Sequence, residues 1–563
     1  MKQNILQLFI ISLLLFAGQA FAGLQVKSPE GVEEKVALFT DRSLYIVGEQ
    51  IQFYATLWQD DDLNKPMQSQ VLYCEIITPK GEKMTANKFF ITQSSVNGCV
   101  IIPDNLLSGT YYFRAYTKLM RNNGPESYAY KQIRIINPLR NELLASENHE
   151  NLPETKFLPI PIKEMEDMFM VTFDKPSYSA RDTIIFTIIP KNTTVSGIKS
   201  LCVSAIPESA ISSAFSLMPT QTPSYTNKEY LPETRGLSIT GKLTEGLSAL
   251  AVKGKTINLS IIGNGADFMA VRTDSTGRFF FALPNYTGSR DIFLCVEKSE
   301  DLDYKIWIDN DYCNLPVNLP TPAFTISEKE RQVILDMAIN KQIRSHFNAD
   351  TTRNEVPTTP KEITFYGKPS TIIVLDNYIQ LPTLEEYFNE LPSQVKVRKH
   401  KGKSQFNVTG SPELSFYDPL VLIDGVAVDN VSKILACAPQ HISRIEVVSE
   451  LYVKGDQTFG GIISIISKKG DFAGIDLPST GIFLNYHFLS DVRCDVNADL
   501  SASSIPDARN TILWKPGIQL KDGQAERIKF AAPDTPGNYA LVIEGVAPNA
   551  GKFLATKVFE VKK

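Results

Sequence analysis

The sequence predicts a mainly β, multidomain protein in which tandem β-sandwich domains accompany a small α/β domain. Short strands of alternating apolar and polar residues recur along the chain, and one motif occurs twice at a full domain's spacing. A hydrophobic fraction of 43% and a charged fraction of 21% are normal for packed domains. With 57 Lys and Arg against 62 Asp and Glu, the net charge of -5 gives no reason to expect nucleic acid as a partner.

The first residues have the features of a secretory signal peptide. Lys2 supplies a positive start, an apolar stretch follows at 5–16, and Ala20-Phe21-Ala22 offers small residues for cleavage. The apolar stretch is shorter than a bilayer span. Gly23 rather than Cys follows the expected cut, which gives no lipoprotein site. We therefore expect an exported, unlipidated chain with no transmembrane segment after signal removal.

The strongest internal signal is a repeat. "DRSLYIVGEQIQF" begins at Asp41 and "DKPSYSARDTIIF" begins at Asp174, 133 residues further on, and the two align without a gap. In the first copy, Ile51 and Phe53 alternate with polar neighbours, which is the period of a strand with one buried face. Further short strands follow at "LYCEII", "GCVII", "GTYYFRAYT" and "YKQIRII". Two copies of one β-sandwich module are expected.

The middle of the chain continues this pattern and then changes it. Asp274 and Gly277 frame a tight turn between two apolar strands. In "SEKERQVILDMAINKQIRSHF", Ser327 and Glu330 form a capping box, and an apolar helix face is formed by Val333, Ile334, Met337 and Ala338. The following residues to about 361 are polar and rich in Pro and Thr, as in a linker.

A small α/β domain is expected next. Asp424-Gly425 between two apolar runs is the signal for a two-residue hairpin. "TLEEYFNEL" and "NVSKILACA" predict short capped helices, and "ISRIEVV" and "GGIISIIS" predict strands. The tail, with "NTILW", "RIKFAA" and "NYALVIEG", returns to a β-sandwich pattern.

Three resemblances follow from these motifs. The repeat, with Tyr45 and Gly48 in one copy and Tyr178 and Arg181 in the other, resembles macroglobulin-type β-sandwich domains of alpha-2-macroglobulin-like proteins. The segment with "ITGKL" and "TDSTGRFFF" is similar to a carboxypeptidase regulatory-like domain, and "DPLVLIDGVAVDN…APQHISRIEVV…FGGIISIISKKG" is similar to the plug domain of TonB-dependent outer-membrane receptors. Together they resemble envelope proteins of Gram-negative bacteria, which implies a location in the periplasm or at the outer membrane.

These resemblances imply the expected domain boundaries. They are a signal peptide at 1–22, macroglobulin-type sandwiches at 23–139 and 140–225, a carboxypeptidase-regulatory-like sandwich at 226–320, a helix and linker at 321–361, a plug-like domain at 362–475, and a C-terminal sandwich at 476–563.

The chain also departs from both larger families. A plug receptor needs a transmembrane barrel, and the 94 residues after Lys469 are too few for one. A protease-trapping macroglobulin carries a Cys-Gly-Glu-Gln thioester, whereas Cys437-Ala438-Pro439-Gln440 lacks the central Gly-Glu. A gate-like module without a pore, and a macroglobulin pattern without a thioester, are therefore expected.

The sequence offers no catalytic constellation. The five histidines are far apart, and no HExxH, nucleophile elbow, P-loop or dinucleotide fingerprint occurs. The Asp60-Asp61-Asp62 run and Asp309-Asn310-Asp311 have no calcium-loop spacing. We expect no enzyme activity, no metal and no cofactor.

The seven cysteines allow only sparse pairing, with Cys74–Cys99 or Cys295–Cys313 as the nearest candidates and most of the others expected as small buried residues.

The expected function is that of a non-catalytic cell-envelope accessory or scaffold protein that binds another envelope or outer-membrane protein. One alternative is an accessory part of a TonB-dependent uptake system whose barrel is a separate chain. Another is a macroglobulin-like protease inhibitor without a thioester. The plug-like motif supplies the candidate site residues, which either preserve the fold or form a docking surface: Asp424, Gly425, Glu446, Gly455, Gly460 and Gly461.

Overall fold

The computed structural model shows a mainly β protein with several packed sheets. It describes residues 32–563 except 61, 63–64, 66, 145–156, 160–162, 165–168, 192–199, 212–215, 220–229, 247–248, 264, 298–302, 349–363, 401–402, 456, 495–505, 521–523 and 548–550. The expected signal peptide lies outside the described residues. No helix within the described ranges is both long and apolar enough to cross a bilayer.

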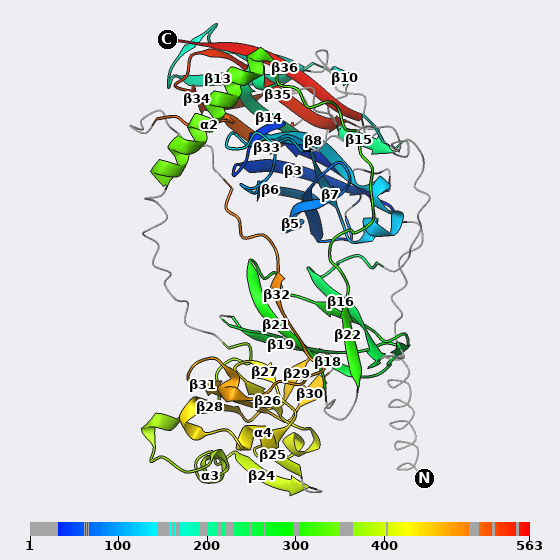
Figure 1. Cartoon of the computed structure of the whole chain (residues 1–563), viewed down its shortest axis with the longest axis vertical. Coiled ribbons are helices and arrows are strands. Elements are labelled where there is room, and N and C mark those ends of the chain that lie inside the picture. The colour runs from blue at the N-terminus through cyan, green and yellow to red at the C-terminus, as the bar shows by residue number, and fades with distance from the viewer. Residues whose placement is uncertain are drawn as a thin grey trace, which may run out of the picture.

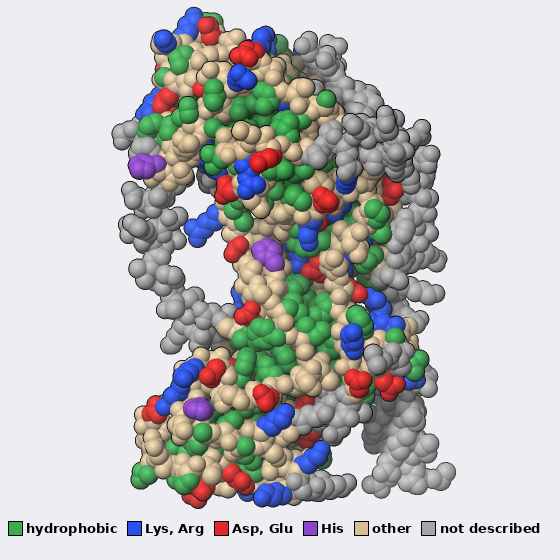
Figure 2. Space-filling view, in the orientation of Figure 1, with side chains coloured by type: hydrophobic (Ala, Val, Ile, Leu, Met, Phe, Trp, Pro, Cys, Tyr) green, Lys and Arg blue, Asp and Glu red, His purple; other side chains and the backbone are tan. Residues whose placement is uncertain are grey.

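The domains are nested rather than strung in order. Figure 1 shows two sandwiches with helix α2 at one end of the molecule, and a third sandwich with a small α/β domain at the other; Figure 2 shows the surface of both ends in the same orientation. This α/β domain, residues 364–475, is called the plug-like domain after its sequence resemblance alone. Strands of the second sandwich come from both before and after the third sandwich in sequence, and strands of the third sandwich likewise enclose the plug-like domain. The chain therefore passes between the two ends of the molecule more than once.

The first sandwich packs two sheets over one core. One sheet has the order β1-β3-β6, and the other has the order β5-β4-β7-β8-β15-β9 with β2 beside β8. Alternate residues of β3, including Ile51, Phe53 and Ala55, are fully buried, as their spacing predicts. The strands are β1 (Glu34–Thr40), β2 (Leu44–Ile46), β3 (Gln50–Gln59), β4 (Val71–Ile77), β5 (Lys83–Phe90), β6 (Ser95–Ile101), β7 (Gly109–Tyr116), β8 (Ala129–Ile136), β9 (Phe157–Pro159) and β15 (Ser216–Pro219).

The sequence repeat is confirmed as a repeated hydrogen-bond pattern. In the first copy the Tyr45 hydroxyl lies 2.7 Å from Asp41 Oδ1, which also accepts the backbone N–H of Gln52 at 3.1 Å. In the second copy the Tyr178 hydroxyl lies 2.6 Å from Asp174 Oδ1, and that oxygen accepts a backbone N–H at 3.1 Å. Each Asp thus ties the turn that it begins, here called the corner (41–49 and 174–182), to the strand that follows.

The two corners also have the same backbone conformation at one position. Gly48 and Arg181 occupy the same place in the repeat, and both have positive φ, 77° and 65°. The acid that follows each of them accepts a backbone N–H three residues earlier: Glu49 from Ile46, and Asp182 from Ser179. Arg181 adopts a conformation that favours glycine. The structure holds it there through an ion pair with Asp534 at 2.7 Å.

The second sandwich corrects the expected C-terminal boundary. Its sheets have the orders β10-β36-β35-β14-β33, with β12 beside β36, and β11-β13-β34. The strands of 513–562 are thus hydrogen-bonded to those of 163–207 and do not form a separate domain. A strand pattern shows which face is buried but not which partner covers an edge. The strands are β10 (Lys163–Glu164), β11 (Phe169–Phe173), β12 (Tyr178–Ser179), β13 (Thr183–Pro190), β14 (Leu201–Pro207), β33 (Leu513–Ile518), β34 (Glu526–Ala531), β35 (Gly537–Ala547) and β36 (Gly551–Lys562).

The third sandwich also takes a strand from the far side of an insertion. β16, β17, β20 and β22 form one sheet, and the other has the order β19-β18-β21-β32, so that β32 joins from residues after the plug-like domain. The predicted turn is present, with the Gly277 N–H donating to the Asp274 carbonyl at 3.1 Å. The strands are β16 (Ser238–Glu245), β17 (Leu250–Ala251), β18 (Thr256–Ile261), β19 (Asp267–Arg272), β20 (Arg278–Ala282), β21 (Ser289–Val296), β22 (Tyr304–Ile308) and β32 (Ile482–His487).

Helix α2 (Glu328–Asn348) packs on the first sandwich. Its predicted capping box is confirmed: the Ser327 hydroxyl lies 3.0 Å from Glu330 Oε2, and the Glu330 N–H donates to the Ser327 hydroxyl at 3.3 Å. Val333, Ile334 and Met337 are buried in the sandwich core. The apolar stripe of the helix is therefore the face that the sequence pattern indicates.

The plug-like domain is a mixed sheet with helices on one face. The sheet order is β23-β28-β31-β26-β27, in which β26 and β31 are parallel, and β24-β25 and β29-β30 are separate hairpins. Both predicted helices have the expected caps, Thr383 for α3 and Asn430 for α4. The elements are β23 (Thr371–Val374), α3 (Leu384–Glu390), β24 (Val395–His400), β25 (Lys403–Val408), β26 (Leu420–Ile423), β27 (Val426–Ala427), α4 (Val431–Leu435), β28 (Ile442–Val448), β29 (Tyr452–Lys454), β30 (Gln457–Phe459) and β31 (Ile462–Ser467).

A disulfide joins distant segments. Cys99 on β6 pairs with Cys494, with the Cα atoms 5.5 Å apart and 395 residues between them in sequence. Both expected pairings are therefore wrong. The former candidates Cys74, Cys295 and Cys313 are free and buried, as is Cys202, which confirms that most of the cysteines are small core residues. Sequence proximity gave the wrong pairs because the nested order brings the segment that follows β32 back to β6.

The joint between the first and third sandwiches contains buried charges. Lys88 Nζ lies 2.5 Å from Asp311 Oδ2 and 2.9 Å from the Tyr486 hydroxyl, so three distant segments meet there. Arg114 and Glu75, both almost fully buried, pair at 2.8 Å. Removing one partner of such a pair leaves an uncompensated buried charge, which costs about 3–5 kcal/mol. The Lys88–Asp311 pair therefore helps to fix how the two sandwiches meet. Arg114 and Glu75 both belong to the first sandwich, and Arg114 reaches across the joint by donating to the Cys313 carbonyl at 3.1 Å.

Candidate functional site

The predicted motif residues lie mainly where the plug-like domain contacts the third sandwich, or where its own segments contact each other. Asp424 and Gly425 form the β26–β27 turn with φ values of 47° and 84°, as the hairpin signal requires. Asp424 Oδ1 accepts the backbone N–H of Ser467 at 2.8 Å, and Oδ2 accepts the Ser467 hydroxyl at 2.7 Å and the N–H of Phe472 at 2.9 Å. The carboxylate thus fastens the turn to the end of β31.

The four glycines lie at places where chain segments come close. A Cβ on Gly425 would lie 3.5 Å from the Ala266 side chain, and one on Gly455 would lie 3.1 Å from the Ala270 carbonyl, both in the third sandwich. A Cβ on Gly460 would lie 2.2 Å from the Tyr417 carbonyl oxygen, closer than packed atoms allow, and Gly461 follows it at the start of β31. The glycines therefore permit backbone contacts, two of them between domains.

Glu446 on β28 is buried and fully engaged. Arg444 Nε donates to its Oε1 at 2.6 Å, and the Tyr366 hydroxyl donates to its Oε2 at 2.7 Å. Both carboxylate oxygens thus have a partner from the plug-like domain or the segment before it. We assign this side chain a structural role.

The plug-like sheet is covered on both faces. Val421 and Ile423 point toward the helices, whereas Leu420 and Leu422 pack with Phe268 of the third sandwich. This double burial explains why β26 and β31 are almost wholly apolar rather than alternating. The third sandwich thus occupies the face that carries Gly425 and Gly455. A role of the six motif residues in meeting another protein stays a prediction.

A cleft of about 510 Å³ opens beside this contact. Its floor includes Thr256 and Asn258 of β18, and its other walls come from β25, the start of β26, the turn before α4, and β30. The volume is in the range of pockets that hold small ligands or short chain segments, and such pockets occur preferentially between domains. We take this inter-domain cleft as the candidate functional site.

The cleft is polar and mostly acidic. The charged residues among those that line it are Glu297, Lys403, Asp418 and Asp429. Asn258 lines it with only 5% of its surface exposed, and Gln457 Nε2 is buried without a hydrogen-bond partner among the described residues. A buried donor without a partner costs about 1–3 kcal/mol, so an acceptor placed beside it is stabilised.

Sequence reasoning missed this cleft because segments far apart in the sequence build it. Thr256, Asn258 and Ser260 alternate with buried Ile257 and Leu259 in β18, a pattern that indicates one core face and one solvent face. In the structure that polar row faces the plug-like domain, and the Ser260 hydroxyl accepts an N–H from β27 at 3.4 Å. The alternation in β18 thus predicted a polar face, but it did not indicate which domain covers that face.

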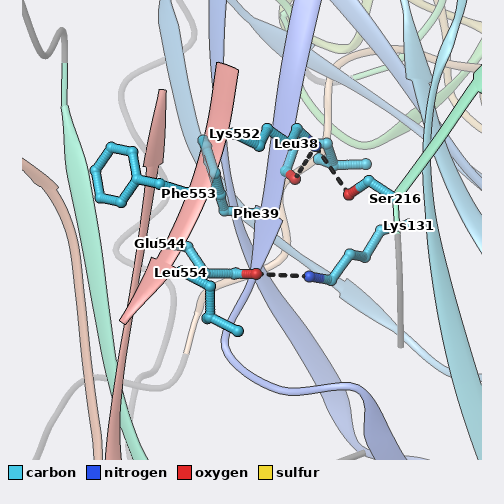
Figure 3. A pocket seen from close by; sticks show the side chains of 8 residues that line it. All are labelled: Leu38, Phe39, Lys131, Ser216, Glu544, Lys552, Phe553 and Leu554. Atoms are coloured by element: carbon cyan, nitrogen blue, oxygen red, sulfur yellow. Dashed lines mark hydrogen bonds and ion pairs between the residues drawn. The ribbon is translucent and has the colours of Figure 1, made fainter. Parts of the chain in front are cut away.

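A second pocket, between the first two sandwiches, is too small for a ligand. It holds about 10 Å³, room for one water at most. Figure 3 shows Lys552 inside it, with Nζ 2.9 Å from the Ser216 hydroxyl and 3.3 Å from the Leu38 carbonyl, beside the Lys131–Glu544 pair at 2.8 Å. Burial, with the charge of Lys131, lowers the pKa of Lys552 to about 7. No substrate has space to reach this amine, so its role is structural.

The potentially reactive side chains outside the cleft are hydrogen-bonded within the chain. Cys437 follows α4, its thiol donates to the Lys433 carbonyl at 3.5 Å, and burial raises its pKa, which disfavours the thiolate. Asp309 Oδ2 accepts from Thr240 and Arg278. Within the described residues, no three His, Cys, Asp or Glu side chains are placed to hold a metal ion together.

Comparisons with known proteins give distant similarity only. No family model and no curated protein matches the chain. Among solved structures, it is similar to Escherichia coli alpha-2-macroglobulin activated by porcine elastase, at 8% identity with TM-score 0.22, covering 94% of this chain and 43% of the other. It is also similar to Salmonella alpha-2-macroglobulin reacted with methylamine, at 8% identity with TM-score 0.23, covering 95% and 40%. A tetra-tandem repeat of a large adhesion protein aligns at 7% identity with TM-score 0.14, covering 94% and 100%.

These alignments carry no functional conclusion. The chain spans about two fifths of the length of the macroglobulin structures, and TM-scores this low do not establish a shared overall fold. None of the three is a TonB-dependent receptor, so the plug resemblance gains no support from them. The repeated hydrogen-bond pattern at Asp41 and Asp174 shows that one module occurs twice in this chain.

Proposed function

We propose that this protein is a non-catalytic accessory or scaffold protein of the bacterial cell envelope, which binds another envelope component through its plug-like and sandwich domains. The observation that carries the proposal is the cleft of about 510 Å³ between the third sandwich and the plug-like domain. It combines a pocket-sized volume with the buried Gln457 Nε2, which has no hydrogen-bond partner among the described residues, and it lies at a domain junction. The described residues that line it bring no nucleophile, base and oxyanion donor together, and binding is the chemistry that they support.

The disulfide supports the envelope location. Disulfides persist in oxidising compartments such as the periplasm and the cell surface, and Cys99–Cys494 ties the segment that follows β32 to β6 of the first sandwich. A scaffold that presents a binding cleft benefits from such a rigid joint. The buried Lys88–Asp311 pair acts in the same region, since Asp311 and Tyr486 both reach the first sandwich there.

Affinity isolation from gently solubilised envelopes tests the proposal. The tagged full chain is crosslinked in the native envelope, purified and analysed by mass spectrometry beside an unrelated exported β-sandwich protein with the same tag. We expect at least one envelope protein to be enriched specifically. If the two preparations contain the same proteins, the proposal is wrong, and enrichment of secreted proteases would favour the inhibitor instead.

A further inference from the structure

The two copies of the repeat differ in what covers the smaller sheet of each sandwich. In the first copy, Phe39 and Trp58 on the outer face of β1-β3-β6 are buried, because they pack with Trp514 of the second sandwich. The matching sheet of the second copy is β11-β13-β34. On its outer face Met170, which is 45% exposed, lies directly opposite the half-buried Ile189. One copy of the module is thus docked, while the same face of the other copy is exposed.

The docked copy shows which groups hold a neighbouring sandwich. The Asn510 amide, just before β33, donates to Glu49 Oε1 of the first corner at 2.6 Å. The Thr511 hydroxyl donates to Asp41 Oδ2 of the same corner. Trp514 follows in β33 and packs on the outer face of the sheet. Adjacent amide and hydroxyl side chains, followed by an aromatic, thus bind both the corner and the face.

The second corner has the same two acceptor oxygens without a donor. Asp174 Oδ1 makes the same bonds within its corner as Asp41 Oδ1 does in the first copy. Asp182 Oδ2 accepts a backbone N–H three residues earlier, as Glu49 Oε2 does. The remaining oxygens, Asp174 Oδ2 and Asp182 Oδ1, accept no hydrogen bond from another described residue. They are the equivalents of the two oxygens that bind the docking segment in the first copy.

The charge on the exposed face favours a separate protein over a second copy of this chain. Arg527 and Lys529 of β34 are exposed there, since Ile528 between them points into the core. Neither cation has an ion pair among the described residues. Two copies that met through this face would bring like charges together, which destabilises an interface. The face around Trp514 is already buried within the chain, so a second copy cannot supply it. The occupant is therefore another protein, with carboxylates opposite the two cations.

We propose that the outer face of β11-β13-β34 and the second corner together dock a β-sandwich domain of a separate envelope protein. Its docking strand carries adjacent amide and hydroxyl side chains and an aromatic, the chemistry that segment 510–514 presents to the first copy. Hydrogen bonds to the two free carboxylate oxygens fix the orientation of that strand as well as adding affinity. This inference rests on the proposed scaffold function but places a partner at a site other than the cleft.

Site-specific photocrosslinking of the full-length protein in the native envelope tests the inference. Benzoylphenylalanine replaces Thr172, which is exposed on the proposed face, and in a matched control it replaces Val558, which is 44% exposed on the other sheet of the second sandwich. Mass spectrometry of the crosslinked peptides identifies both the partner and the segment that is contacted. Circular dichroism and thermal melting check that both variants fold as the wild type does.

We expect position 172 to crosslink to a β-sandwich strand of another exported protein, one that carries the amide and hydroxyl pair, and position 558 to give no such product. Crosslinking at 172 only to a second copy of this chain, only to a glycan, or to nothing overturns the inference.

Affinity measurements then separate the face from the corner. The crosslinked sandwich domain is purified and titrated against the wild type, Met170→Glu and the matched control Val558→Glu. Met170→Glu sets a carboxylate against an acidic partner, so we expect a loss of about tenfold or more, and less than about twofold for the control. Asp182→Asn keeps an acceptor for the Ser179 N–H but replaces the free oxygen by an NH₂ group, so it should also weaken binding. Equal affinities for Met170→Glu and Val558→Glu would contradict docking at this face.

The envelope isolation separates this inference from the proposed function. If Met170→Glu loses the sandwich protein crosslinked at 172 while the wild type and Val558→Glu retain it, the inference holds. If all three retain the same partners, docking at β11-β13-β34 is wrong while the scaffold function stands. If the wild type enriches no specific partner, the inference and the proposed function both fail.

Discussion

Removing the corner hydroxyl in the two copies of the repeat, by Tyr45→Phe and Tyr178→Phe, should have unequal effects. The two hydroxyls make nearly identical contacts, at 2.7 Å and 2.6 Å to an Asp Oδ1. Their surroundings differ, because Asp41 is 2% exposed whereas Asp174 is exposed. Burial raises the pKa of Asp41, while the pKa of Asp174 is lowered, since its hydrogen bonds outweigh a smaller effect of burial.

The magnitudes follow from solvation. A hydrogen bond to a charged group contributes about 1.5–3 kcal/mol, and a buried acceptor left without its donor loses that full amount. The single Tyr45 hydroxyl proton is shared between Asp41 Oδ1 and the Arg42 carbonyl, each 2.7 Å away, so Tyr45→Phe removes one hydrogen bond at a buried site and we expect a cost of about 2–3 kcal/mol. At Asp174 water replaces the lost donor, and we expect about 1 kcal/mol or less for Tyr178→Phe.

Hydrogen exchange in increasing urea, read by mass spectrometry, measures each corner separately. Peptides that cover β3 report the first sandwich, and peptides that cover β13 report the second, so no assumption of a single unfolding transition is needed. The free energy of opening should fall more for β3 in Tyr45→Phe than for β13 in Tyr178→Phe. Equal losses, or a larger loss in the exposed copy, would refute the reasoning from burial.

Four further outcomes are expected. The pKa of Lys552 falls to about 7 in the fold, so between this pH and the ordinary lysine range the folded state binds fewer protons than the unfolded state. The free energy of unfolding of the wild type should therefore rise relative to Lys552→Met, by about 2 kcal/mol between pH 7 and 9. If urea unfolding gives the same difference between the two proteins at both pH values, this expectation is contradicted. Non-reducing peptide mapping should recover Cys99 linked to Cys494, and any other major linkage would contradict the fold. Gly425→Ala should lower the free energy of unfolding by about 1 kcal/mol or more, since φ there is 84°; an unchanged melting temperature would count against the turn. Methylamine should leave the mass unchanged, whereas an adduct with a new thiol at Cys437 would revive thioester chemistry.

Features set by neighbouring residues could be predicted from the sequence. The Asp424-Gly425 turn, the Ser327 capping box and the helix caps involve contacts across a few residues, so local spacing determines them. The repeat beginning at Asp41 and Asp174 belongs to the same class, because each corner bonds to the strand that follows it. Asp424 lies in the turn that the sequence predicts, whereas the contacts of Glu446 could not be inferred from the sequence.

Only the tertiary structure decided which distant segments meet. The alternation within β34 shows a buried face, yet any edge strand of matching length satisfies it, so its pairing with β13 cannot be inferred. The link between Cys99 and Cys494 and the cleft over Asn258 depend on the same long-range order. Backbone hydrogen bonds between strands are chemically alike at every position, and their partners are selected by the packing of whole sheets rather than by any short stretch of sequence.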